Sequence, residues 1–238
     1  AEGLHEVTRM AARSTLAKAL AAGSALTGAG LALYVTRVRP WHLRWNATDE
    51  ELHMAMPGDE EVGRPHYDAT WAITIDAPSD LVWPWLVQMG EGRGGFYSYD
   101  FVENLMGMRI RSVRRLMPEY QVLRPGDFIP AGSGPGLYVK RVDPGRALVL
   151  GNPPSLEHEL SATWATVLID LADGRTRLIS RNRFRIHRWT PGKVLQFAVL
   201  DPGIFVMARK WMLGIKQRAE ALHAHTSRPE APEPPTLH

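Results

Sequence analysis

The densest group of polar and aromatic side chains in the 238-residue chain comprises Arg93, Tyr97, Tyr99, Asp100 and Glu103. Tyr99 and Glu103 are four residues apart, so on a helix they share one face. Such a group can line the mouth of a cavity, where Arg93 or a tyrosine binds the polar end of a ligand. Alternatively, these residues cap a helix, with Asp100 near the positive end of its dipole. Both interpretations stay open at this point.

Other motifs offer little chemistry. The glycine-rich stretch 90–95 (GEGRGG) follows an expected helix and lacks the Lys-Ser/Thr pair of a Walker loop, so it indicates a loop between helices. Glu157, His158 and Glu159 are adjacent and cannot all point at one metal ion from a single strand or helix. The chain has no cysteine and no Gly-x-Ser-x-Gly motif. We expect no metal and no cofactor, and no catalytic residue can be assigned, which argues against an enzyme.

Basic residues concentrate between positions 175 and 188 (RTRLISRNRFRIHR), in a chain whose net charge is +3. A nucleic-acid site would need aromatic side chains interleaved with these charges, and there are few. We therefore expect no nucleic-acid partner. The basic segment is interpreted as a solvated strand face, with anionic lipid headgroups as the alternative partner.

An apolar run from residue 19 to 35 (ALAAGSALTGAGLALYV) contains no charge and has basic residues on both sides. A membrane-spanning helix needs about 17–25 apolar residues. We expect residues 16–38 to form one transmembrane helix in contact with membrane lipid, and a buried soluble helix is the alternative. The nearly equal basic flanks leave the orientation open, with the soluble domain expected on the cytoplasmic side.

Four segments follow from composition and pattern. Residues 1–38 are the tail and the expected membrane helix, and residues 39–66 form a connecting arm that is first Trp-rich and then acidic. Within the arm, Thr48 and Glu51 have the spacing of a capping box. Residues 67–225 form one domain, and residues 226–238 form a Pro-rich tail that we expect to be disordered.

The domain begins with alternating residues 67–75, which predict a strand, and continues with helices expected over 81–89 and 98–106. Turn signals then divide several strands, and the last helix is predicted over 202–223 with Asp201 as its N-cap. Asp173 and Gly174 predict a two-residue hairpin that pairs Ala172 with Arg175. In this register Thr163 faces Phe184, the side chains that point inward are Leu178, Ser180, Asn182, Phe184 and Ile186, and the arginines at 181, 183 and 185 face water.

The run from Ile73 to Leu86 (ITIDAPSDLVWPWL) resembles the opening of the START-like superfamily, also called SRPBCC or polyketide-cyclase-like. In that family a strand enters helices through a short D/A-x-P turn and a helix that contains Val-Trp. The resemblance covers about residues 67–223 and implies an α+β helix-grip fold, in which a curved antiparallel sheet surrounds a long C-terminal helix. It also implies a cavity for lipids, sterols or polyketides. Members include carriers, sensors, cyclases and oxygenase subunits, so the fold alone does not give the function.

On this basis we expect a membrane-anchored protein that binds or carries a small apolar ligand such as a lipid or polyketide. Two alternatives remain, namely an accessory subunit of a larger membrane-protein complex and an enzyme of the cyclase or hydrolase type. An open apolar cavity favours the first function, a cavity closed by Trp and Met side chains the second, and a buried acid–base pair the third. The expected ligand-binding residues are Trp71, Ile73, Arg93, Tyr97, Tyr99, Glu103, Ser180, Asn182, Phe184, Trp211, Met212 and Ile215.

Overall fold

A computed structural model describes residues 23–24, 27–105, 107–132 and 135–227, except for the side chains of residues 194–199. The chain divides into two compact units, residues 1–42 and residues 43–238. The described part of the first unit contains the π-helix η1 (Tyr34–Val38) and leads into α2 (Arg39–Leu43). Within it, the Tyr34 hydroxyl lies 3.1 Å from Nε2 of His42.

Among the residues that the structure describes, no helix combines the length and the apolar content that a membrane crossing requires. Of the transmembrane helix predicted over residues 16–38, residues 16–22 and 25–26 lie outside the described part of the chain, as does most of the tail predicted over 226–238. Both therefore stay predictions.

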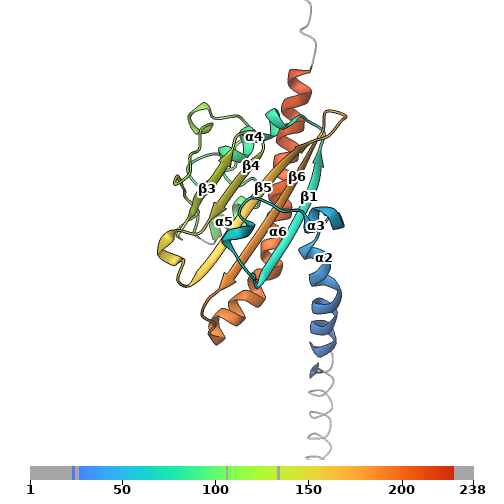
Figure 1. Cartoon of the computed structure of the whole chain (residues 1–238), viewed down its shortest axis with the longest axis vertical. Helices are drawn as coiled ribbons and strands as arrows, with labels where there is room; N and C mark the ends of the chain where they lie inside the picture. The colour runs from blue at the N-terminus through green and yellow to red at the C-terminus, as the bar shows by residue number, and fades with distance from the viewer. Residues whose placement is uncertain (1–22, 25–26, 106, 133–134, 228–238) are drawn as a thin grey trace, which may run out of the picture. The chain divides into compact units, whose positions relative to one another are not determined.

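The second unit is built on one antiparallel sheet of six strands in the order β1-β6-β5-β4-β3-β2 (Figure 1). Its strands are β1 (Tyr67–Ile75), β2 (Phe128–Ile129), β3 (Leu137–Asp143), β4 (Ala147–Gly151), β5 (Leu160–Asp170) and β6 (Thr176–Ile186). The first strand pairs with the last, so the sheet places the start and the end of the domain side by side.

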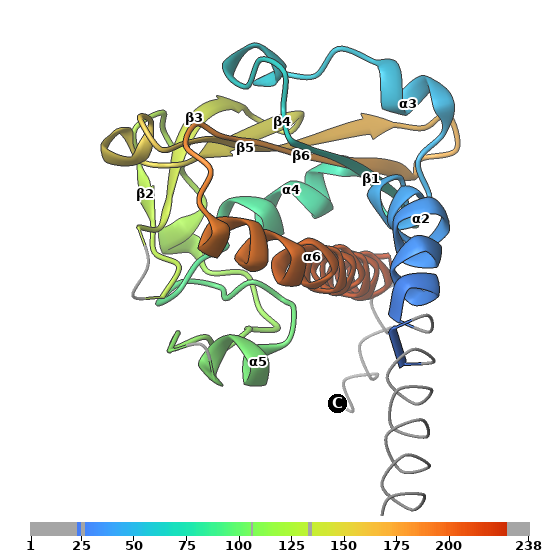
Figure 2. The same cartoon turned by 90° about the horizontal axis from the view of Figure 1, so that it is seen from below.

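Helices and short helical turns cover the sheet on both faces. They are α3 (Asp49–His53), η2 (Asp59–Glu61), α4 (Ser79–Val87), α5 (Asp100–Leu105), η3 (Pro118–Tyr120), η4 (Pro154–Leu156) and α6 (Pro191–Thr226). Figure 2 shows α4 and the 36-residue helix α6 on one face and the arm with α3 on the other. The expected α+β architecture, an antiparallel sheet packed on a long C-terminal helix, is confirmed.

Each face of the sheet has its own apolar cluster, because alternate side chains of a strand point to opposite sides. Toward α4 and α6, the larger cluster includes Tyr67, Trp71 and Ile73 from β1. On the arm side, a smaller cluster contains Ala72 and Ile179 with Met56 of the arm. The alternation expected for residues 67–75 and for the inward face of β6 is thus confirmed.

The predicted register of the β5–β6 hairpin was wrong by one residue. Asp170 pairs with Thr176, and Ala162 rather than Thr163 pairs with Phe184. The turn holds three residues, 172–174, and Gly174 has a φ of +80°. This geometry is that of a type I turn followed by a left-handed residue, in place of a two-residue turn. Since a slip of one residue reverses every side chain of a strand, the predicted faces of β5 were also wrong.

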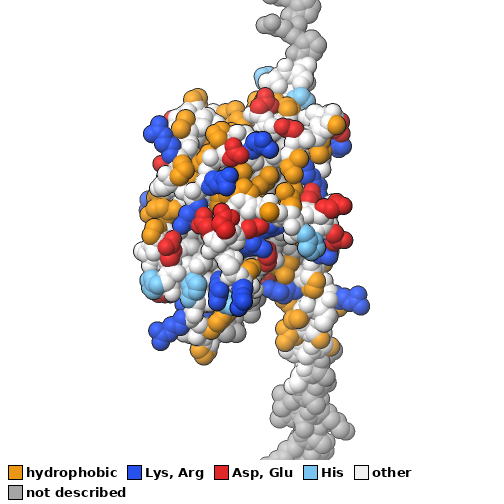
Figure 3. All heavy atoms as spheres, in the orientation of Figure 1, with side chains coloured by type: hydrophobic (Ala, Val, Ile, Leu, Met, Phe, Trp, Pro, Cys, Tyr) orange, Lys and Arg blue, Asp and Glu red, His pale blue; other side chains and the backbone are white. Residues whose placement is uncertain are grey.

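The basic face of β6 was predicted to be solvated, and this too was wrong. Figure 3 shows acidic and basic side chains close together on the face that the arm covers. Arg181 is only 3% exposed and pairs with Asp59 at 2.7 Å. Arg177 pairs with Glu51 at 2.7 Å. The acidic arm therefore neutralises these two arginines, and the pairing of Arg177 together with the burial of Arg181 removes the reason to expect lipid headgroups there.

The beginning of the last helix was predicted eleven residues too late. It begins at Pro191, where the Thr190 side chain accepts a hydrogen bond from the backbone nitrogen of Lys193 at 3.2 Å. Pro202 lies inside the helix, where a proline removes one backbone hydrogen bond and bends the axis. Figure 1 shows the first turns of α6 running at an angle to the rest. The capping box in the arm is confirmed, since Thr48 and Glu51 exchange hydrogen bonds.

Candidate functional site

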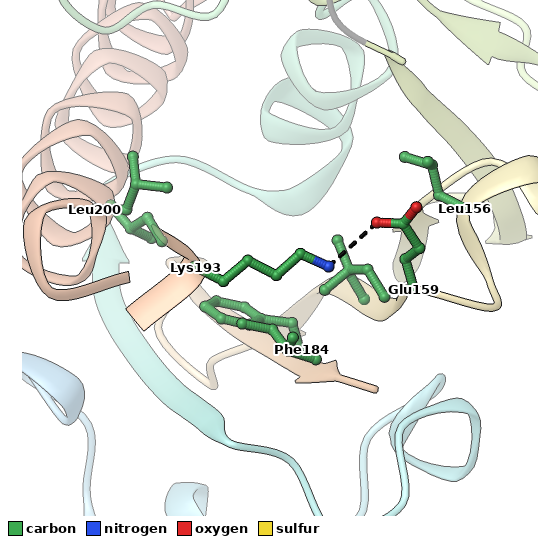
Figure 4. Close-up of a pocket in the computed structure, with 9 residues that line it drawn as sticks. Leu156, Glu159, Phe184, Lys193 and Leu200 are labelled. Atoms are coloured by element: carbon green, nitrogen blue, oxygen red, sulfur yellow. Dashed lines mark hydrogen bonds and ion pairs between the residues drawn. The ribbon is translucent and has the colours of Figure 1, made fainter. Parts of the chain in front are cut away.

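An apolar cavity of about 330 Å³ lies between the β5–β6 end of the sheet and the first half of α6 (Figure 4). Its lining combines seven apolar residues with one acid and one base, namely Leu156, Glu159, Leu160, Ala162, Phe184, Ile186, Lys193, Leu200 and Ile204. A cavity of this size and composition is suited to a small apolar molecule.

A second cavity of about 290 Å³ adjoins the first and shares five of its lining residues. It extends toward the start of β3 and the end of β4, and it adds polar side chains to the lining. One of them, Asn152, is fixed by its own contacts, because its Oδ1 accepts a hydrogen bond from the Ala162 nitrogen at 2.7 Å. Another, Asn182, contacts the Ser180 hydroxyl through Nδ2 at 3.4 Å. A few polar groups in an apolar lining are typical of sites that orient a ligand.

Phe184 forms a wall that the two cavities share. Its ring stacks on that of Tyr67, its partner across the β1–β6 pair, with centroids 4.6 Å apart and planes at 12°. Tyr67 is fully buried, so it supports the Phe184 ring from the side of the core. The wall is therefore held in place before any ligand arrives.

Glu159 and Lys193 form the charged part of the first cavity. The Lys193 Nζ donates to Glu159 Oε2 at 3.1 Å, and Figure 4 shows the lysine extending from the start of α6 toward the acid. The hydrogen bond and the charge of Lys193 lower the pKa of Glu159. A carboxylate whose pKa is lowered is a weak proton acceptor, so this pair is better suited to binding a polar group than to general base catalysis.

Side chains of the protein fill the centre of the space between sheet and helix. Trp71, Trp211, Met212 and Ile215 are each at most 2% exposed. The Trp211 indole packs against that of Trp164, with ring centroids 4.8 Å apart and planes at 72°. Neither cavity is lined by any of the core side chains Trp71, Trp211, Met212 and Ile215, or by Ile73 and Ser180.

Most side chains of the group between residues 93 and 103 form structural contacts with the neighbouring backbone and loops. Arg93 donates to the Met89 and Val87 carbonyl oxygens at the end of α4, at 3.0 and 2.9 Å. Tyr97 is buried, and burial raises its pKa. Asp100 accepts two hydrogen bonds from Ser112, one from the backbone nitrogen at 2.8 Å and one from the hydroxyl at 2.6 Å. These contacts favour the structural interpretation of the group over the cavity mouth.

Glu103 is the exception in this group, because it is 3% exposed and points into the protein. Its Oε1 accepts a hydrogen bond from the Ser98 hydroxyl, and its buried Oε2 has no hydrogen-bond partner. Burial raises the pKa of Glu103, and the nearby charge of Asp100 adds to this increase. The residue lies in neither cavity.

Of the twelve residues expected to bind a ligand, only Phe184 and Asn182 line the cavities, and the binding role of the others stays a prediction. Sequence reasoning missed Ala162 and Leu160 because of the shifted register, and Lys193 and Leu200 because of the late helix start. Thr190 followed by Pro191 is a recognisable helix start and could have placed the last two. In the described part of the chain, no group of acidic or histidine side chains is suited to a metal ion.

No protein-family model matches the chain, and no curated protein matches it. Solved structures are similar in fold. Protein NE0264 from Nitrosomonas europaea is 14% identical, with 66% of this chain and 96% of that chain covered and a TM-score of 0.41. The hypothetical protein jhp0584 from Helicobacter pylori is 12% identical, with 70% and 95% covered and a TM-score of 0.44. CalU16 from Micromonospora echinospora is 15% identical, with 68% and 89% covered and a TM-score of 0.32. At these values the similarity concerns the arrangement of elements and carries no argument about a ligand.

Proposed function

We propose that the protein binds or carries a small apolar ligand in the cavity beneath the first half of α6, and that residues 16–38 anchor it to a membrane. The lining of the first cavity supports the ligand site, because seven apolar side chains surround a single Glu159–Lys193 pair. An apolar molecule with one polar end fits this distribution. A carboxylate or phosphate on the ligand would compete with Glu159 for Lys193.

A cavity-filling substitution tests the ligand site. Ala162 lines both cavities, so Ala162→Trp should occupy the shared space. The matched control is Ile169→Trp, which adds an indole to the same strand at a position that is 38% exposed. The fluorescent fatty acid cis-parinaric acid is titrated into each protein. We expect saturable binding to the wild type and to the control and its loss in Ala162→Trp. Equal binding to all three proteins would contradict the site.

The membrane anchor rests on the sequence, because the apolar run of residues 19–35 carries no charge and has basic flanks. We expect the full-length protein to stay in the membrane pellet after a carbonate wash, and deletion of residues 1–38 to release it. Release of the full-length chain by carbonate would contradict the anchor and leave the ligand site unaffected.

The second candidate is an accessory subunit of a membrane complex. The observation that favours it is the closed centre of the sheet–helix interface, where Trp71, Trp211 and Met212 fill the space. In that case the purified protein would carry another subunit and no small molecule.

A further inference from the structure

Helix α5 presents its apolar residues to the solvent and a carboxyl group to the interior. Phe101 and Leu105, four residues apart on one face, are 79% and 78% exposed, and Val102 beside them is 39% exposed. Glu103, on the opposite face, is 3% exposed. In water the stable arrangement of such a helix is the reverse, with the acid outside and the apolar residues inside.

The segment that follows α5 in the chain carries positive charge that has no ion-pair partner among the described residues. Ile110 is buried, whereas its neighbours Arg109 and Arg111 are exposed. Arg114 and Arg115 are exposed as well. In the part of the chain that the structure describes, none of these four arginines forms an ion pair, in contrast to Arg177, Arg181 and Arg183 on the sheet.

Hydrogen bonds hold the arginine segment against α5. Asn104 accepts from the Ile110 nitrogen at 2.7 Å and donates to the Ile110 oxygen at 3.0 Å. Asp100 binds Ser112 through both carboxylate oxygens. These bonds keep the two segments together. We call their exposed apolar residues and arginines the α5 surface and define it as Phe101, Val102, Leu105, Arg109, Arg111, Arg114 and Arg115. Figure 2 shows α5 on the side of α6 away from the sheet.

We infer that the α5 surface docks on a membrane that contains anionic lipid. Apolar side chains that enter the headgroup layer and arginines that contact lipid phosphates are the two features of an interfacial membrane site. At six residues α5 is much too short to cross a bilayer, so the contact is interfacial. The inference goes beyond the proposed function and does not depend on the N-terminal anchor.

The absence of cysteine makes a direct test possible, because one introduced cysteine takes one fluorophore. Full-length Leu105→Cys carrying NBD is mixed with phosphatidylcholine vesicles, with or without phosphatidylglycerol. We expect the emission to shift to the blue and to gain intensity with the anionic vesicles only. The control is Ile169→Cys, an exposed apolar position at the β5–β6 hairpin, whose emission should not change.

The arginines are tested in the same labelled protein. A basic residue near an anionic surface contributes about a fivefold change in affinity. Replacing Arg109 and Arg111 by Gln should therefore weaken binding to anionic vesicles by about tenfold or more. Replacing Arg175, at the β5–β6 turn, and Arg185, on β6, should leave this affinity unchanged. Three results would overturn the inference: an NBD signal that does not depend on phosphatidylglycerol, an affinity that is unchanged when Arg109 and Arg111 are replaced, or a signal that rises with protein concentration in the absence of lipid.

A carbonate wash separates this inference from the anchor. A protein that stays in the membrane while the Leu105 label remains in water would overturn the α5 docking alone. A protein that carbonate releases, but whose label responds to anionic vesicles, would support the docking and contradict the anchor.

Discussion

Arg181 is the residue that ties the arm to the sheet. Its guanidinium donates five hydrogen bonds, which is its full capacity. The acceptors are the Thr70 hydroxyl on β1, the Asp59 carboxylate and the carbonyl oxygens of Met54, Glu51 and Leu52. A buried arginine is stable only when its charge is paired and its donors are used, and the arm supplies these partners.

Truncation of Arg181 should therefore be costly. Breaking a buried ion pair by removing one partner typically costs about 3–5 kcal/mol, so we expect this loss in the free energy of unfolding of Arg181→Ala. Arg185→Ala is the control, because Arg185 is half-buried and makes one hydrogen bond, to the Gly63 oxygen at 3.0 Å. It should cost less than about 1 kcal/mol. Urea unfolding measures both, and similar losses at the two positions would show that the arm is not held through Arg181.

At the scale of elements, α6 approaches the backbone of Tyr97 closely at Gly214. A Cβ atom there would collide with the backbone oxygen of Tyr97 and lie 2.8 Å from the Tyr97 Cβ. Tyr97 has little freedom to move, because it is buried and has a φ of +57°. The position of the helix thus depends on the absence of a side chain at residue 214.

Two glycines of the same helix give a matched prediction. Gly214→Ala should destabilise the protein by about 1–3 kcal/mol through overpacking. Gly203 has open space around its Cβ position, so Gly203→Ala should stabilise the helix by about 0.5–1 kcal/mol. Thermal unfolding followed by circular dichroism measures both. A Gly214→Ala variant at least as stable as the wild type would mean that the contact with Tyr97 is looser than described.

The elements that the sequence predicted correctly are those with strong periodic patterns. The strand 67–75 and the inward face of β6 follow from alternation, and the capping box at Thr48 follows from two residues at fixed spacing. The errors arose where local signals have two solutions. Asp173-Gly174 fits both a two-residue and a three-residue hairpin loop, and Pro202 resembles a helix start although it lies inside α6.

At the scale of the whole molecule, the site was predicted only in part because tertiary packing decides which apolar residues face a cavity. Trp211 and Phe184 both point into the space between sheet and helix. Trp211 is closed in by its neighbours, whereas Phe184 borders open volume. The charged face of β6 illustrates the same limit. Its sequence alone indicates a solvated face, whereas the burial of Arg181 depends on Asp59 in an arm that lies more than one hundred residues earlier in the chain.

The central claim is that the cavity beside Phe184 holds an apolar molecule. Native mass spectrometry of the wild type and of Ala162→Trp, purified side by side in a mild detergent, tests this claim most directly. We predict that the wild type carries an additional mass that organic solvent releases as an intact apolar compound, and that Ala162→Trp lacks it. The same bound mass in both proteins, or a wild type that is empty and binds no apolar compound on addition, would contradict the claim.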